Sequence, residues 1–228
     1  MRLGATIVIA WLCGIGLVLA QGRGGAPQPP PAETVAPEIA GVVAAGTRVV
    51  PIKDDVQNAQ GAIAAPDGSL LFTERVLNRI TRLDPAGNFS IYMENTDATN
   101  SFPIDPMGRV IGVRYNPPQL AVLAPTPRVL ADNFEGQKFG RPNDLVVDSK
   151  GGVYFTDDMA PPPGKNAVYY VNPAGQIIRI TDQMGRPNGV QLSPDGKILY
   201  VADPGGEHVM AFDVQPDGSA RNPRQFAR

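Results

Sequence analysis

Four amide side chains occupy the same position in four successive copies of one short sequence segment. Each amide precedes eight residues that end in a turn glycine: Gly68, Gly108, Gly151 or Gly196. The amides are Gln60, Asn100, Asn143 and Asn188. Around a common axis they would present neutral oxygen atoms of the kind that holds a hard cation such as Ca²⁺. The alternative is that the amides only cap turns, and the residue types alone leave both interpretations open.

Short β-prone runs follow each turn glycine, and these are the elements that must position the amides. The runs are Leu70-Leu71-Phe72-Thr73, Val110-Ile111-Gly112-Val113, Val153-Tyr154-Phe155-Thr156 and Ile198-Leu199-Tyr200-Val201. Successive turn glycines lie 40, 43 and 45 residues apart, and a four-stranded propeller blade takes about 40–50 residues. The pattern therefore predicts an all-β fold, a β-propeller with about four blades present. Further turns at 84–87, 172–175 and 215–218 predict an outer hairpin in three of these blades.

Other hydrolytic chemistries have little support in this sequence. It contains no Gly-x-Ser-x-Gly and no His-Glu-x-x-His motif, and its single histidine, His208, is expected at a loop-to-strand junction. Three aspartates that end predicted strands are interpreted as turn-fixing residues: Asp157, Asp158 and Asp203. The only cysteine is Cys13, in the apolar N-terminal segment, so a cysteine nucleophile in the folded part is excluded.

Composition and the N-terminus predict an exported, folded chain. Of 228 residues, 43% are hydrophobic and 18% are charged, with a net charge of -2, which disfavours disorder and nucleic-acid partners. Residues 1–20 are predicted to be a signal peptide, with periplasmic or secreted localisation and no stable membrane span after cleavage. The alternative is an uncleaved membrane anchor. Residues 21–46, rich in Pro, Gly and Ala, are expected to be a linker before a partial propeller at 47–228.

Two segments at blade spacing resemble the SMP-30/gluconolactonase/LRE family. These are residues 140–157, which begin Gly-Arg-Pro-Asn-Asp, and residues 185–203, which begin Gly-Arg-Pro-Asn-Gly. The resemblance extends over about residues 55–228. It implies a propeller of the six-bladed type, incomplete here, that depends on Ca²⁺ or another divalent cation and hydrolyses a small-molecule lactone or a sugar-derived lactone. The sequence carries no indication of the oligomeric state.

The resemblance also implies roles for individual residues. Asn188 matches an asparagine that ligates the metal, and Asn143 matches one that binds either metal or substrate. Arg141 matches a substrate-contacting arginine, although it would equally serve to pack over the neighbouring blade with a solvated head. Gln60 stands where the family usually has a metal-binding glutamate. That difference removes one negative charge from the implied calcium site and should weaken it.

The catalytic residue of this chain is unknown, because the family's general-base aspartate is expected one blade beyond the Asn188 motif. One further period from Asn188 reaches about residue 231, past Arg228. The resemblance therefore predicts a lactone hydrolase in its full-length form, with little or no turnover by residues 1–228 alone. The rival hypothesis is a non-catalytic exported propeller that serves as a platform for binding a ligand or a protein, and Gln60 favours it.

Overall fold

The computed structural model describes residues 34–162 and 164–228, so the predicted signal peptide at 1–20 lies outside the described residues. The chain divides into two compact units, residues 1–54 and 55–228. In the first unit, β1 (Thr34–Val35) pairs with β2 (Arg48–Val49) in an antiparallel ladder. Within the described ranges, no helix has the length and apolar character needed to cross a membrane.

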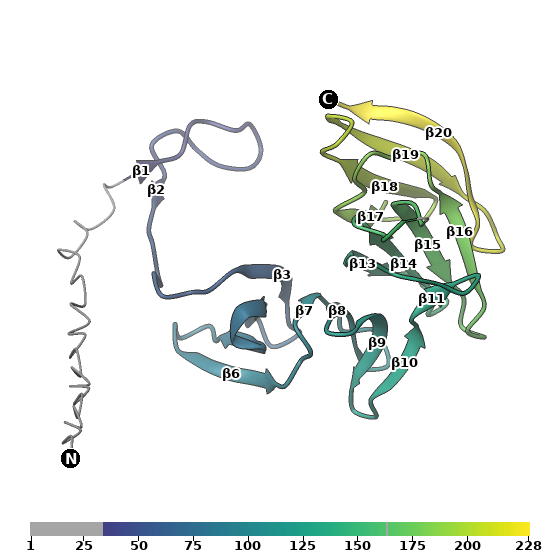
Figure 1. Ribbon diagram of the computed structural model, residues 1–228. Helices are drawn as coiled ribbons and strands as arrows, with labels where there is room; N and C mark the ends of the chain where they lie inside the picture. The colour runs from purple at the N-terminus through teal and green to yellow at the C-terminus, as the bar shows by residue number, and fades with distance from the viewer. Residues whose placement is uncertain (1–33, 163) are drawn as a thin grey trace, which may run out of the picture. The chain divides into compact units, whose positions relative to one another are not determined.

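The second unit consists mainly of four antiparallel sheets of four strands each, which follow one another along an arc (Figure 1). Blade 1 holds β3 (Ala59–Ala64), β4 (Leu70–Glu74), β5 (Arg79–Leu83) and β6 (Phe89–Glu94). Blade 2 holds β7 (Thr99–Ser101), β8 (Val110–Tyr115), β9 (Pro118–Ala124) and β10 (Arg128–Ala131). Blade 3 holds β13 (Pro142–Val147), β14 (Val153–Asp157), β15 (Ala167–Val171) and β16 (Ile177–Thr181). Blade 4 holds β17 (Val190–Leu192), β18 (Ile198–Asp203), β19 (His208–Val214) and β20 (Ala220–Ala227).

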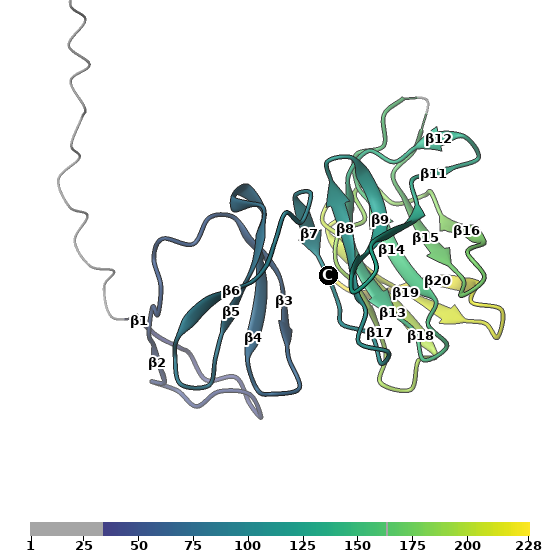
Figure 2. The same ribbon diagram turned by 90° about the horizontal axis from the view of Figure 1, so that it is seen from below.

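Two small elements lie outside the four-stranded sheets. The 3-10 helix η1 (Arg75–Leu77) connects β4 to β5, and the hairpin β11 (Asn133–Phe134) with β12 (Gln137–Lys138) precedes blade 3. Figure 2 shows this hairpin projecting beyond the strands of blade 3. The prediction of an all-β, incomplete propeller with four blades is therefore confirmed.

The turns form where the sequence pattern places them. All seven predicted turn glycines have positive φ, between +69° and +88°, a region that glycine enters without steric cost. One detail of strand alignment differs between blades. Val201 lies opposite Val190 in blade 4, whereas Phe155 lies opposite Leu145 in blade 3. The blade 4 turn contains one more residue, because Ser193 N–H bonds to Ile198 O over five residues instead of four.

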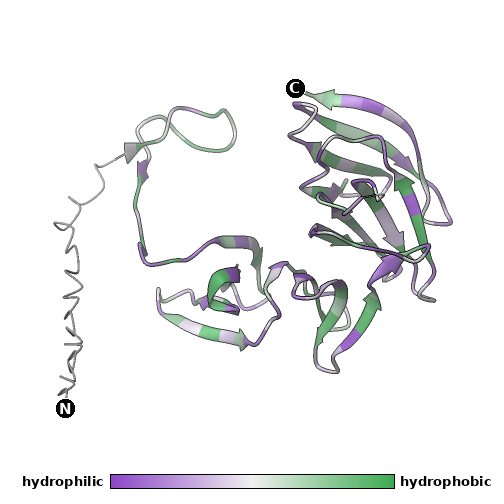
Figure 3. Cartoon of the chain, in the orientation of Figure 1, coloured by the Kyte–Doolittle hydropathy of each residue, from purple (hydrophilic) through white to green (hydrophobic). Residues whose placement is uncertain are grey.

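Hydrophobic side chains pack between neighbouring blades. Alternate residues of β14 face opposite ways, so Tyr154 packs with Leu199 and Phe212 of blade 4, while Phe155 packs with Leu120 of blade 2. Because both faces of blade 3 are buried, its two middle strands, β14 and β15, are buried at every residue, without the alternation of a half-exposed strand. Hydrophilic residues colour much of the outermost strand β20 in Figure 3. Blade-to-blade packing thus holds the inner strands in register.

Two glycines in matching turns provide a test of this packing. Gly175 and Gly218 both have φ +85°, but a Cβ on Gly175 would meet nothing within 4 Å, whereas one on Gly218 would lie 2.0 Å from the Tyr170 ring. Tyr170 is buried and its hydroxyl is bonded to Asp148, so the ring cannot move aside. We expect Gly175→Ala to lower the free energy of unfolding by about 1 kcal/mol and Gly218→Ala by about 3 kcal/mol. Urea denaturation of both variants measures the difference, and equal losses would contradict the packing described.

Candidate functional site

The four predicted amides line a single cavity of about 400 Å³. Gln60 lies in β3, Asn100 in β7 and Asn143 in β13, whereas Asn188 lies two residues before β17, so each blade supplies one amide at or just before its innermost strand. Asn100 is buried, Asn143 and Asn188 are half-buried, and Gln60 is exposed. The structure thus brings together every residue that the repeat nominates at this position.

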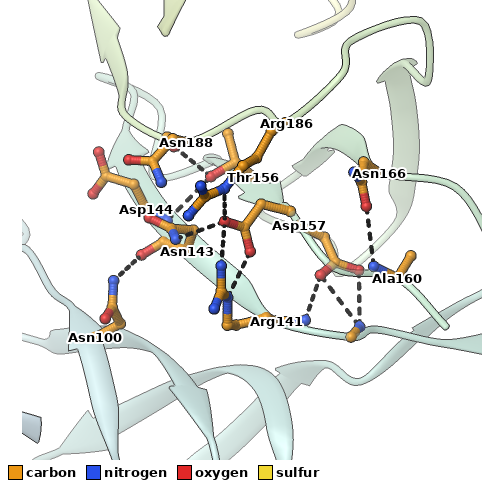
Figure 4. A network of polar contacts seen from close by, with 12 residues as sticks. Asn100, Arg141, Asn143, Asp144, Thr156, Asp157, Ala160, Asn166, Arg186 and Asn188 are labelled. Carbon is orange, nitrogen blue, oxygen red and sulfur yellow. Dashed lines mark hydrogen bonds and ion pairs between the residues drawn. The ribbon is translucent and has the colours of Figure 1, made fainter. Parts of the chain in front are cut away.

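Threonines at equivalent positions hold the backbone of the next blade's amide. The Thr73 hydroxyl donates to Asn100 O at 2.9 Å, and the Thr156 hydroxyl donates to Asn188 O at 2.6 Å. Blade 2 carries Val113 at this position. There the side-chain amide of Asn100 forms the connection, donating to Asn143 O at 2.8 Å. Figure 4 shows these contacts around Asn143 and Asn188. They fix the amide-bearing strands relative to one another.

The amide groups are oriented so that oxygen atoms remain available to a ligand. Asn143 donates its Nδ2 to Asp158 at 3.2 Å, which leaves Oδ1 without a partner among the described residues. The side chains of Asn188 and Gln60 make no hydrogen bond within the described part of the chain. Within 34–162 and 164–228, no group of three or more His, Cys, Asp or Glu side chains is placed to hold a metal ion. The predicted ligands are amides, and neutral oxygens of this type suit Ca²⁺.

Asp144, which the sequence analysis did not nominate, also lines the cavity. Its Oδ1 accepts a hydrogen bond from the Ser101 hydroxyl at 2.6 Å, and its Oδ2 accepts one from Val190 N–H at 2.9 Å. One carboxylate therefore connects blades 2, 3 and 4 and adds a negative charge beside the amides. The repeat does not indicate this residue, because the equivalent positions in the other copies are Gly61, Ser101 and Gly189.

Acids at the ends of second strands fix the turn that precedes each amide. Asp157 accepts hydrogen bonds from the N–H groups of Gly140 and Arg141, and Asp203 accepts them from Gly185 and Arg186. Burial raises the pKa of the Asp157 carboxyl above its ordinary value, against the effect of its backbone partners. The turn-fixing role predicted for these two aspartates agrees with this geometry.

In blades 1 and 2 the end of the second strand is also bonded to the turn that precedes the amide, but by different groups. In blade 1, Glu74 accepts the N–H of Gln57 at 3.3 Å. In blade 2 a basic residue replaces the acid, because Arg114, the next-to-last residue of β8, donates to the Asp97 carboxylate of the preceding turn at 2.5 Å. His208 begins β19 as predicted, with Nδ1 2.6 Å from Gly206 O.

Asp158 has a larger role than the turn-fixing one predicted for it. Its buried carboxylate accepts hydrogen bonds from Arg141 Nε at 2.7 Å and from the same guanidinium's terminal nitrogen at 2.8 Å. Arg186 Nε approaches it at 3.3 Å, and Asn143 donates its amide to the same carboxylate. The bond to Asp158 raises the pKa of Arg141 further above its ordinary value. Asp158 thus orients two predicted site residues, Arg141 and Asn143.

Arg75 and Tyr115 complete this polar group at the end of the strands. The register places both at the position that Asp158 occupies in blade 3. The Arg75 guanidinium carbon lies 5.1 Å from the centre of the Tyr115 ring. Burial raises the pKa of Tyr115 to about 12, against the opposing effect of Arg141. We call Arg75, Tyr115, Arg141, Asp158 and Arg186 the channel mouth.

The repeat contained a signal that would have found part of the channel mouth. Two residues before each amide stand Asn58, Ala98, Arg141 and Arg186. Arg141 and Arg186 both belong to a Gly-Arg-Pro-Asn motif, so Arg186 could have been predicted as a site residue together with Arg141. Only the fold shows that the two arginines converge on one carboxylate.

Comparison with known proteins relates most of the chain to one protein family. A family model described as SMP-30/Gluconolactonase/LRE-like region matches residues 58–228. A gluconolactonase from Zymomonas mobilis subsp. mobilis is 26% identical over 214 residues, which cover 80% of this chain and 59% of that protein. A lactonase drp35 from Staphylococcus haemolyticus is 37% identical over 78 residues, which cover 33% of this chain and 24% of the relative.

Solved structures agree on the fold. A gluconolactonase from Xanthomonas campestris superposes with a TM-score of 0.73 at 22% identity, over 85% of this chain and 70% of that one. This chain therefore has the fold of that protein. It spans 59% of the length of the Zymomonas relative.

Proposed function

Because the chain belongs to the SMP-30/gluconolactonase/LRE-like family, we propose that it forms part of a calcium-dependent enzyme that hydrolyses a sugar-derived lactone. The observation that carries this proposal is the single cavity lined by one amide from each of four blades. Lactonases and gluconolactonases among the relatives support the reaction class.

Asn143, Asn188 and Gln60 would hold the calcium ion. Their oxygens fit the ion in type, and Asp144 adds a carboxylate to the same cavity. When bound, the ion would polarise the lactone carbonyl and favour attack by water. Gln60 is the weakest of the three candidates, since it alone is exposed. We therefore expect Asn143 and Asn188 to contribute more to calcium affinity than Gln60.

The channel mouth would bind and orient the substrate. The two hydrogen bonds to Asp158 fix the Arg141 guanidinium, leaving its remaining N–H groups for oxygen atoms of a sugar ring. Asn143 lies between the channel mouth and the cavity, because its Nδ2 contacts Asp158 and its Oδ1 has no partner among the described residues. A substrate held by Arg141 would thus place its reacting carbonyl beside the amides.

Calcium dependence tests the proposal in two arms. We expect Ca²⁺ to raise the Tm of the 228-residue chain, and a chelator to reverse the effect. In the second arm, the product of the whole open reading frame should hydrolyse gluconolactone in a calcium-dependent way. Turnover that persists with chelator present would contradict the calcium-dependent mechanism.

A non-catalytic binding platform is the second candidate, and the exposed, uncharged Gln60 favours it. The same measurements separate the two functions. A full reading-frame product that binds sugars but hydrolyses no lactone would support the platform. Export of the protein, based on residues 1–20, remains a proposal alongside either function.

A further inference from the structure

Three guanidinium groups from three blades gather at the channel mouth. Arg75 comes from blade 1, Arg141 from the turn before blade 3, and Arg186 from the turn before blade 4. All three lie close enough to Tyr115 to influence its hydroxyl electrostatically, as does Asp158. The mouth therefore concentrates positive charge around one neutral tyrosine.

Asp158 is the one carboxylate that pairs with these arginines among the described residues. Arg141 engages both of its oxygens, whereas Arg186 reaches it with Nε alone, at 3.3 Å. Arg75 forms no ion pair in the described part of the chain; one terminal nitrogen donates to Asn58, and its buried Nε has no hydrogen-bond partner. The arginines thus carry more charge and more donors than Asp158 satisfies.

The two neighbouring aspartates do not remove this excess of donors. Asp157 and Asp203 use their oxygens to accept backbone N–H groups of the turns that carry Arg141 and Arg186. The Arg186 side chain is 51% exposed, and its two terminal nitrogens form no hydrogen bond within the described residues. A guanidinium in this state is suited to bind an oxyanion through two parallel N–H groups.

We propose that the channel mouth binds an oxyanion carried by the substrate, with Arg186 as the specificity-determining residue, so that the lactone is an anionic sugar derivative. This inference rests on the proposed function. The mouth adjoins the amide cavity through Asn143, which lines the cavity and contacts Asp158. A lactone with a carboxylate or phosphate at one end would place that group on Arg186 and its carbonyl near the amides.

Binding of non-hydrolysable sugars to the 228-residue chain tests the inference. The probes are glucuronate, glucose 6-phosphate and neutral glucose, measured by isothermal titration calorimetry. We expect at least one anionic probe to bind about tenfold or more tightly than glucose, and the preferred probe identifies the oxyanion as carboxylate or phosphate. Arg186→Gln should weaken binding of that probe about tenfold, and Arg186→Lys should restore part of it. The matched control, Arg221→Gln on the outermost strand β20, should leave binding unchanged.

Two results would overturn the inference: glucose binding as tightly as both anions, or Arg186→Gln binding the preferred anion as tightly as the unmodified chain. Since Arg186 is half-exposed, its replacement should not prevent folding. None of the probes contains a lactone, so anion binding is measured independently of hydrolysis. If anions bind but the full reading-frame product opens no lactone, the proposed function fails while the anion site stands.

Discussion

Asn188→Ala is expected to abolish the calcium-induced rise in Tm and to lower lactone turnover by the full reading-frame product at least about a hundredfold. The substitution removes an amide oxygen that faces the cavity without a hydrogen-bond partner among the described residues. The Asn188 backbone carbonyl still accepts the Thr156 hydroxyl, so the strand should keep its position. A loss of metal binding without a large loss of stability would therefore identify Asn188 as a ligand.

Asn172 provides the matched control. Its amide bonds to Gln176 in an outer turn of blade 3, so Asn172→Ala should leave both calcium binding and turnover unchanged. Asn143→Ala then separates the two roles left open for that residue. Weaker calcium binding would assign Asn143 to the metal, and a raised KM with unchanged calcium affinity would assign it to the substrate. An unchanged calcium response in Asn188→Ala would exclude Asn188 as a ligand.

Asp144→Ala is expected to have the largest effect on stability, lowering the free energy of unfolding by about 3–5 kcal/mol. It removes hydrogen bonds from the Ser101 hydroxyl and from Val190 N–H, and bonds to a charged acceptor contribute about 1.5–3 kcal/mol each. Both donors would lose their partner in the interior between blades. Urea denaturation followed by circular dichroism measures the change.

Two further variants make this prediction specific. Asp144→Asn keeps one acceptor oxygen and should lose less stability, which also covers the case in which the alanine variant does not fold. Asp195 accepts hydrogen bonds only within its own exposed turn, so Asp195→Ala should change stability by less than about 1 kcal/mol. Similar losses for Asp195→Ala and Asp144→Ala would show that the contacts between blades contribute little.

Local patterns predicted the blades and the amide cavity well. Turn glycines at a spacing of 40–45 residues identified four repeats, and every turn glycine has the positive φ that its role requires. Because blades in a propeller surround one axis, equal positions in the repeat predict proximity in space. This reasoning placed Gln60, Asn100, Asn143 and Asn188 on one cavity before any coordinate was known.

Contacts between residues at different positions of the repeat could not be predicted. Asp158 follows the second strand of blade 3, whereas Arg186 precedes the first strand of blade 4, and no repeat relates the two. The extra residue in the blade 4 turn could not be predicted either. The spacing of the turn glycines is the same whether the strand after the turn pairs one residue earlier or one residue later. Strand pairing and side-chain reach decide such contacts, and neither follows from the spacing of glycines.

The ion pair between Arg114 and Asp97 limits how blades of this chain can be recombined. In blades 1, 3 and 4 an acid ends the second strand, so the preceding turn needs only a backbone N–H as partner. In blade 2 the partner must itself be an acid. A chimera that transfers β8 without residues 95–98 would leave Arg114 facing a turn that offers no carboxylate. Blade 2 should therefore be grafted or duplicated only as one cassette that begins before Asp97.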